Sequence, residues 1–244
     1  MNTVVIGYDP REQEAFDVCV HSLRRHARDP VRVVKLDQTE LRHAGLYDRP
    51  YRVDEAGQMW DERDKRPFSV AFSFSRFLVP QIASGPALFV DCDFLFRRDV
   101  GELFALFDPT YAVQVVKHDH RPAGAVKMDG ISQAAYNRKN WSSCVLWNTG
   151  HHGNAALSAH VVNTWPGRYL HAFDWLADCY IGSIPEAWNW LADASPTCGG
   201  NVDDIAAIHY TSGGPWFDHM QNCPMGDLWL AERAHMRRAM ADAD

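Results

Sequence analysis

Two aspartates one residue apart follow an apolar run near the middle of this 244-residue chain. The run, residues 87–90, opens after a Gly-Pro pair and leads directly into Asp91-Cys92-Asp93. A short apolar run bounded by turn residues predicts a buried strand. Burying a carboxylate is costly unless a cation compensates its charge. Two carboxylates at the end of a buried strand therefore predict a bound metal ion.

The elements expected around this pair begin with a β-α-β unit. Residues 3–7 and 31–36 are apolar enough for strands, and residues 11–28 carry a helical apolar rhythm. Such a unit favours a parallel sheet that binds ligands at the carboxyl ends of its strands. Ser69 is a plausible N-cap for a helix over 69–82, just before the aspartate-bearing strand.

The rest of the chain is less regular, and residues 37–67 are polar and without a clear period. Further helices are expected over 99–107, 155–165, 174–180 and 227–240, and further strands over 88–91, 111–116, 144–148 and 205–210. No internal repeat or linker is visible, which predicts a single domain spanning residues 1–244.

Composition narrows the class of protein. The chain is 46% hydrophobic, which suffices for a core, and its formal net charge of −7 argues against general nucleic-acid binding. None of the six cysteines forms a Cys-x-x-Cys pair, which disfavours a zinc finger or a thioredoxin-type site. The first residues carry neither a basic segment nor a long apolar one. We therefore expect a cytoplasmic protein with free thiols and at most peripheral membrane association.

Four segments, in order, resemble glycosyltransferase family 8. Residues 73–80 carry Ser, Arg and Pro in a pattern close to the family's Ser-x-x-x-Arg-x-x-x-Pro, and residues 88–93 match its apolar strand into Asp-x-Asp. Residues 98–104 carry the family's next pattern, Asp-hydrophobic-x-x-Leu. The block 208–216, Ile-His-Tyr-Thr-Ser-Gly-Gly-Pro-Trp, is similar to the family's late "His-Phe-x-Gly-x-x-Lys-Pro-Trp".

The resemblance implies a GT-A-like fold, a Rossmann-like α/β arrangement in which helices flank a mixed, mostly parallel sheet. Residues 1–116 would form the nucleotide-binding half, and residues 117–244 the acceptor-side half and the C-terminal helix. Asp91, Asp93 and His209 would hold Mn²⁺ or Mg²⁺. Oxygen ligands with one imidazole suit Mn²⁺, and phosphate oxygens can complete its shell.

Further site residues follow from the same resemblance. Arg76 would place its guanidinium near the acidic pair or the diphosphate, where its fork can bind in a bidentate manner. The remaining candidates are Tyr8 and Asp9 against the base and ribose, Trp216 against the donor, and Asp174 and Asn189 as catalytic residues near the reacting sugar.

The chain departs from the family pattern at two places. Gly214 replaces the lysine that would contact the donor diphosphate, and Lys117, Lys139 and Arg76 are candidates to supply the missing cation. The segment 142–144 reads Ser-Ser-Cys where the family has Asn-[Ser/Ala]-Gly, so Ser143 or Asn148 is expected to replace the donor-sugar contact.

The resulting hypothesis is a metal-dependent hexosyltransferase that moves a sugar from a UDP- or GDP-sugar to an acceptor hydroxyl with retention. The acceptor could be a glycan, a lipid-linked molecule or a small molecule. One alternative is a catalytically silent nucleotide-sugar-binding protein. Another is an Asp-x-Asp phosphohydrolase, which Leu95 disfavours because that chemistry calls for Thr or Val there. The donor, the acceptor and the oligomeric state stay open.

Overall fold

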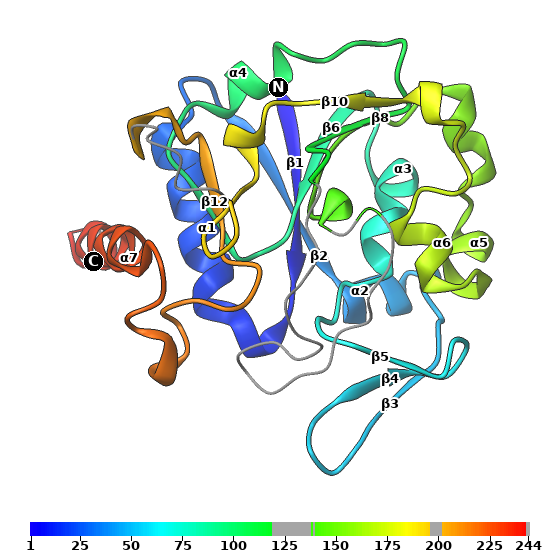
Figure 1. Ribbon diagram of the computed structural model, residues 1–244, viewed down its shortest axis with the longest axis horizontal. Helices are drawn as coiled ribbons and strands as arrows, with labels where there is room; N and C mark the ends of the chain where they lie inside the picture. Colours follow the sequence, from blue (N-terminus) through cyan, green and yellow to red (C-terminus); the bar gives the residue numbers. More distant parts are fainter. Residues whose placement is uncertain (119–137, 139, 196–201, 243–244) are drawn as a thin grey trace.

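The structure, a computed structural model, describes residues 1–118, 138, 140–195 and 202–242. A six-stranded sheet runs through its centre (Figure 1). In spatial order the strands are β10 (Ile181–Ser183), β8 (Val113–Val115), β9 (Cys144–Asn148), β6 (Pro86–Val90), β1 (Asn2–Tyr8) and β2 (Val31–Asp37). Only β9 among these strands runs against the others. The expectation of a mixed, mostly parallel sheet is thus confirmed.

The central strands are apolar along their whole length because both faces of the sheet are covered. Val4, Val5 and Ile6 of β1 are fully buried, as are residues 87–90 of β6. Continuous apolar runs, rather than alternating ones, are typical of parallel strands that are buried on both sides. The apolar run that precedes the two aspartates therefore forms one of the innermost strands.

Helices cover both faces of this sheet, with α1 on one side and α3, α5 and α6 on the other (Figure 1). The helices are α1 (Gln13–His26), α2 (Gln38–His43), α3 (Val79–Ile82), α4 (Val100–Phe104), α5 (Ala159–Thr164), α6 (Gly167–His171) and α7 (Gly226–Ala241). The C-terminal helix α7 packs on the outer side of α1 (Figure 1). Within the described residues, none of these helices is long and apolar enough to cross a bilayer.

A second, smaller sheet lies directly beyond the acidic pair. It consists of β11 (Trp190–Leu191), β12 (Ala207–His209) and β7 (Phe94–Phe96). Strand β7 begins immediately after Asp93 and pairs antiparallel with β12, so that Phe94 lies opposite His209. This pairing brings two segments more than a hundred residues apart in sequence to the same place.

The segment expected to be irregular, residues 37–67, contains α2 and most of a third sheet. Its strands are β3 (Tyr51–Val53), β4 (Met59–Asp61) and β5 (Arg66–Phe68), which project from the body of the molecule (Figure 1). Strands of three residues are too short to show a period in the sequence. A buried ion pair holds the segment together: Arg49 Nε and Nη2 each lie 2.8 Å from an oxygen of Asp61.

Several expected elements are shorter than their sequence patterns suggested. The helix expected over 69–82 is confined to the 3₁₀ turn Ser75–Leu78 followed by α3. One reason is that Asp9 accepts a hydrogen bond from the Ala71 N–H, which holds the start of the segment in turns. The helix expected over 174–180 is a single 3₁₀ turn, Asp178–Tyr180, whereas β1, α1, β9 and α7 lie close to their expected bounds.

Candidate metal and donor site

The three predicted metal ligands converge. Asp91, Asp93 and His209 offer ligand atoms that all lie within 4.8 Å of one another. Their residues are only 9%, 8% and 2% exposed, respectively. Asp91 and Asp93 lie in the turn from β6 to β7, and His209 ends β12. The Tyr210 N–H donates to the Asp93 carbonyl oxygen at 3.0 Å, which fixes the histidine strand against the turn.

The orientation of His209 suits a metal ligand. Asn189 uses its amide NH₂ to donate to Ser143 Oγ at 3.0 Å, so its Oδ1 is the atom that faces His209 Nδ1, at 2.9 Å. An amide oxygen only accepts, so Nδ1 carries a proton, and in the neutral ring Nε2 is then the nitrogen with the free lone pair. Histidines that bind metals are oriented by such a hydrogen bond from the other ring nitrogen. The imidazole also stacks on Phe94, with ring centroids 4.7 Å apart.

The spacing between His209 and Asp93 fits two ligands of one ion. His209 Nε2 lies 3.4 Å from Asp93 Oδ1, beyond the usual N–H···O range of about 2.7–3.2 Å. Adjacent ligands on an octahedral ion with bonds of about 2.1 Å lie roughly 3 Å apart. Carboxylate oxygens with one imidazole form a donor set that Mn²⁺ and Mg²⁺ accept, with a preference for Mn²⁺ because of the nitrogen ligand.

Arg76 pairs with the first aspartate, in the position expected from its spacing. Its Nη1 lies 2.8 Å from Asp91 Oδ1, and its Nη2 donates to Asp91 Oδ2 at 3.3 Å. Nη1 also donates to the Ser142 carbonyl oxygen at 3.1 Å. A carboxylate has about four lone-pair sites, so Asp91 can keep this fork and still bind an ion. Both partners are buried, which makes the pair part of the site rather than a surface contact.

Asn189 was expected to be catalytic and lies in contact with His209 instead of open to solvent. It is completely buried, and its NH₂ group also lies 3.4 Å from the Asn140 carbonyl oxygen. The residue therefore connects His209 with the segment that enters β9. Of the two expected substitutes for the donor-sugar contact, Ser143 belongs to this network. Asn148 lies at the opposite end of β9, level with Pro86 at the start of β6, and is away from the acidic pair.

Tyr8 ends β1 and Asp9 follows it, but the side chains of both residues contact other residues of the protein. Asp9 is buried and accepts from Arg11 Nη2 at 2.7 Å and from the Ala71 N–H at 2.8 Å. Burial raises the pKa of Asp9, but the hydrogen bonds and charge of Arg11 and the Ala71 N–H outweigh it and hold the pKa below its usual range. Lys35 Nζ lies 3.7 Å from the centre of the Tyr8 ring. The contact of Tyr8 and Asp9 with a nucleotide stays a prediction.

The other catalytic candidate, Asp174, is exposed and follows Phe173, which adopts a left-handed conformation with φ of 57°. Within the described residues it does not join the hydrogen-bond network around His209. Its catalytic role therefore stays a prediction.

Gly214, which stands where the family 8 pattern has a lysine, lies directly beneath the Trp216 side chain. The Trp216 indole lies over Gly214, and a Cβ built at Gly214 would be 2.1 Å from Trp216 Cζ3. No side chain fits at Gly214 while the indole keeps this place. Trp216 itself packs between Tyr210 and Trp229, with ring centroids 6.1 and 5.5 Å away. Its expected contact with a donor stays a prediction.

Lys117 follows β8 and donates to the Ile181 carbonyl oxygen at 2.8 Å. It is exposed, whereas Arg76 is buried and paired with Asp91. Lys139 lies outside the described residues. Of the three candidates to replace the missing lysine, Lys117 is thus the one whose side chain the structure places at the surface.

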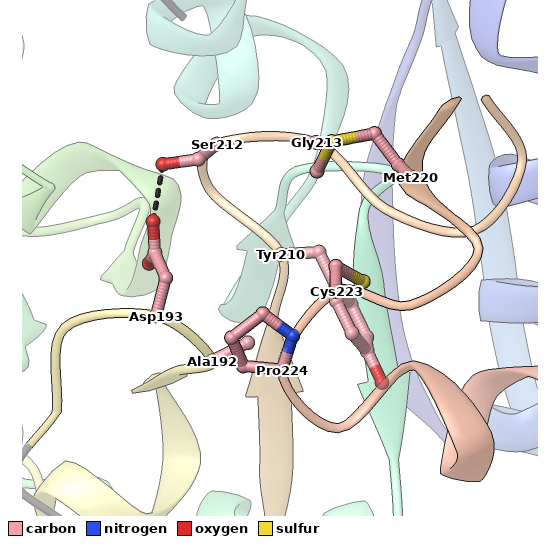
Figure 2. A pocket seen from close by; sticks show the side chains of 8 residues that line it. All are labelled: Ala192, Asp193, Tyr210, Ser212, Gly213, Met220, Cys223 and Pro224. Carbon is pink, nitrogen blue, oxygen red and sulfur yellow. Dashed lines mark hydrogen bonds between the residues drawn. The ribbon is translucent and has the colours of Figure 1, made fainter. Parts of the chain in front are cut away.

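The loop after His209 encloses a small cavity, shown in Figure 2. Its volume of about 10 Å³ suits no more than a single water molecule. The Ser212 hydroxyl donates to the Asp193 carboxylate, and both residues line this cavity (Figure 2). This contact ties the loop to the chain after β11 and so helps to fix the end of β12.

Solved structures with the same fold are glycosyltransferases. WbbM, a bifunctional glycosyltransferase, superposes with a TM-score of 0.63 at 16% identity over 96% of this chain. GlyE of Streptococcus pneumoniae TIGR4 gives 0.59 at 15% over 99%, and the galactosyltransferase LgtC, solved with donor and acceptor sugar analogs, gives 0.56 at 14% over 96%. This chain spans 49% of the WbbM chain, 64% of GlyE and 95% of LgtC. At these identities the likeness shows the GT-A fold alone.

Sequence comparison identifies a much nearer relative. No family model matches the chain. Protein CDI of Arabidopsis thaliana is 45% identical over 237 residues, which cover 94% of this chain and 85% of that protein. Identity of this extent shows common descent, although the relative's name states no reaction. The protein described here is a member of the family of Protein CDI.

Proposed function

We propose that this protein is a metal-dependent glycosyltransferase that moves a hexose from a UDP- or GDP-sugar to an acceptor hydroxyl. The observation that carries the proposal is the buried convergence of Asp91, Asp93 and His209 beyond the carboxyl end of β6. Open α/β sheets bind their ligands at this edge. The GT-A fold, shared with the glycosyltransferases compared above, supports the same reading.

The charges of the cluster fit a divalent cation and a diphosphate together. Two carboxylates and the Arg76 guanidinium sum to −1, and a divalent ion would change this sum to +1. A site of net positive charge attracts the diphosphate of a nucleotide sugar. When bound, such an ion neutralises the charge that develops on the leaving diphosphate.

The residues of the chain would contribute position rather than covalent chemistry. Arg76 holds Asp91, and Asn189 holds His209, so the ligand atoms are oriented before the donor arrives. Because Asp91 and Asp93 are committed to this cluster, neither is placed as a nucleophile toward the sugar carbon. Retention of configuration is therefore proposed to proceed by attack of the acceptor hydroxyl on the face that the diphosphate leaves.

The acceptor is proposed to be a glycan, a lipid-linked molecule or a small molecule, since the cluster contains nothing that selects among them. A cytoplasmic location is proposed because the described cysteines Cys19, Cys92, Cys144, Cys179 and Cys223 are all free thiols.

A second function, nucleotide-sugar binding without turnover, is favoured by one observation. The Trp216 indole closes the position at which the family pattern has its diphosphate-binding lysine. Without that cation the leaving diphosphate would be less well stabilised. Release of UDP or GDP from the donor would identify a transferase, whereas tight binding without release would identify a silent binding protein.

The experiment that tests the metal site is a thermal-shift panel. Nucleotide sugars and nucleoside diphosphates would each be added with Mn²⁺, Mg²⁺ or a chelator. A ligand at a hundred times its Kd stabilises the native state by about 2.7 kcal/mol. We expect the stabilisation to require Mn²⁺ or Mg²⁺ and to disappear in Asp93→Asn. Asp29→Asn, a change at an exposed aspartate, is the matched control and should respond as the wild type does.

An Asp93→Asn protein that keeps the full metal-dependent shift would refute the assignment of the cluster. Phosphate release from simple monoesters, without nucleotide binding, would favour the phosphohydrolase alternative.

A further inference from the structure

Asn140 is a buried residue beside the cluster that carries an unusual backbone. It directly precedes the 3₁₀ turn Trp141–Ser143, which leads into β9. Its φ of 65° and ψ of 0° place it in the left-handed region, which asparagine tolerates better than most residues. Sparsely populated backbone conformations persist where the surrounding structure over-determines them, and they are common at ligand-binding sites.

The backbone of Asn140 is held by the same network that orients His209. Its carbonyl oxygen accepts from Ser143 Oγ at 2.7 Å and from the Asn189 amide at 3.4 Å. Asn189 in turn accepts the His209 Nδ1 proton. Asn140 is thus separated from a predicted metal ligand by one side chain.

In the side-chain amide of Asn140, the oxygen accepts a hydrogen bond, whereas the NH₂ group has no acceptor among the described residues. Thr211 Oγ1 donates to Asn140 Oδ1 at 3.4 Å, which turns the NH₂ group the other way. The residue is 6% exposed, and the buried Nδ2 has no hydrogen-bond partner among the described residues. Buried donors in native proteins are normally satisfied, so such a group points to a ligand that supplies the acceptor.

We propose that the Asn140 amide donates a hydrogen bond to a hydroxyl oxygen of the donor hexose, an inference that rests on the glycosyltransferase function proposed above. The amide is neutral, and a neutral donor suits a neutral hydroxyl. The diphosphate, by contrast, calls for the positive charge that the cluster would gain from a divalent ion. The neutral Asn140 amide is therefore proposed to contact the sugar rather than the diphosphate of the donor.

The left-handed backbone dictates the variants for the test. Asn140→Ala would strain the backbone, so its effect would mix folding with binding. Asn140→Gly keeps the conformation and removes the amide, and Asn140→Asp keeps the shape but removes the NH₂ donors. Binding of Mn²⁺ alone, together with the melting temperature, shows whether each variant keeps the cluster and the fold.

Titration calorimetry in the presence of Mn²⁺ would compare UDP-glucose with UDP, and GDP-mannose with GDP. We expect both variants to bind the nucleotide sugar about 3- to 10-fold more weakly than the wild type does, as is typical for the loss of one hydrogen bond. Binding of the nucleoside diphosphate alone should change little in Asn140→Gly.

Two results would overturn the proposal: unchanged affinity for the nucleotide sugar, or an equal loss for the nucleoside diphosphate, which would place the amide on the diphosphate. Failure of the wild type to bind any of the four ligands would instead reject the proposed function itself.

Discussion

Asn189 shows how a single buried side chain can orient a candidate metal ligand. It accepts the Nδ1 proton of His209 and donates to Ser143, and it is completely buried. The arrangement leaves one ring nitrogen of His209 protonated and directs the other toward Asp93. These contacts place Asn189 behind a candidate metal ligand, and the catalytic role that its sequence context suggested stays a prediction.

Asn189→Leu is predicted to weaken Mn²⁺ binding, because the substitution removes the acceptor that holds His209 while roughly keeping the volume. Loss of such an orienting partner typically costs about 10- to 100-fold in metal affinity. Electron paramagnetic resonance of free Mn²⁺ would measure the change. Ser143→Ala removes the hydrogen bonds of Ser143 Oγ with Asn189 and with the Asn140 carbonyl oxygen but leaves the contact between Asn189 and His209, so it should have a smaller effect. Wild-type affinity in Asn189→Leu would mean that His209 does not depend on this contact.

Residue types and spacing predicted which side chains of the cluster would meet, but not how they are held. The meeting of the Asp-x-Asp motif, Arg76 and His209 could be predicted because each of them belongs to a recognisable sequence pattern. Asn140 carried none, since a left-handed backbone at a non-glycine residue cannot be read from one sequence. The departure at Gly214 was visible in the sequence, but the Trp216 indole that lies over this glycine was not, because that contact depends on three-dimensional packing.

Among the elements, length decided what could be predicted. β1, α1 and α7 are long or strongly apolar, and their expected bounds were nearly correct. The strands of the two small sheets have two or three residues each, too few for a period, and of these strands only β12 fell within an expected one, residues 205–210. One of these sheets nevertheless builds the site, because the pairing of β7 with β12 places His209 beside the acidic turn.

The C-terminal helix α7 is fixed to α1 by a buried carboxylate. Glu232 accepts from Arg25 Nε at 2.9 Å and lies 2.8 Å from His21 Nδ1. Burial raises the pKa of Glu232, but the hydrogen bonds of Arg25 and His21 outweigh it, so the pKa lies below its ordinary value of 4.5. A depressed folded-state pKa contributes stability above the unfolded pKa and loses it as the pH falls through the folded pKa.

Glu232→Gln is therefore predicted to lower the free energy of unfolding at pH 7 by about 1–3 kcal/mol, the usual range for hydrogen bonds to a charged group. Below pH 4.5 the difference from the wild type should shrink, because the wild-type carboxylate becomes protonated as well. Urea unfolding at several pH values would measure both effects.

Glu14→Gln is the matched control for this change. Glu14 also joins α7 to α1, through Arg237 Nη2 at 2.7 Å, but it is about a third exposed. Its loss should cost no more than about 1 kcal/mol. Equal effects of the two substitutions would mean that burial of Glu232 adds nothing to the attachment of α7.

The molecule as a whole is joined across distant segments by a second buried ion pair. Arg49 and Asp61 are both almost completely buried, and Arg49 Nη1 also donates to the Trp165 carbonyl oxygen at 2.7 Å. These contacts attach the projecting β3–β5 sheet to the end of α5. No sequence pattern revealed this connection, because Arg49 and Asp61 both lie within residues 37–67, where the sequence shows no clear period.

Arg49→Met is predicted to destabilise the protein by about 3–5 kcal/mol, because it leaves the Asp61 carboxylate buried without its partner. Arg52→Met, which removes an exposed pair with Glu62, should cost at most about 1 kcal/mol. Guanidinium unfolding of both variants would provide the comparison. Similar stability of the two variants would contradict the structural role given to Arg49.

The cysteine in the acidic turn, Cys92, is expected to be unreactive. Cys92, between the two aspartates in sequence, faces the main core together with Cys144. Burial, followed by the negative charge of Glu12, raises the pKa of the Cys92 thiol well above its usual value. The thiolate is the nucleophile that reacts with peroxide and with maleimides, so both reagents should leave such a thiol unmodified. Cys179, exposed on the surface, is in contrast a natural attachment point for a fluorescent label that spares the acidic turn.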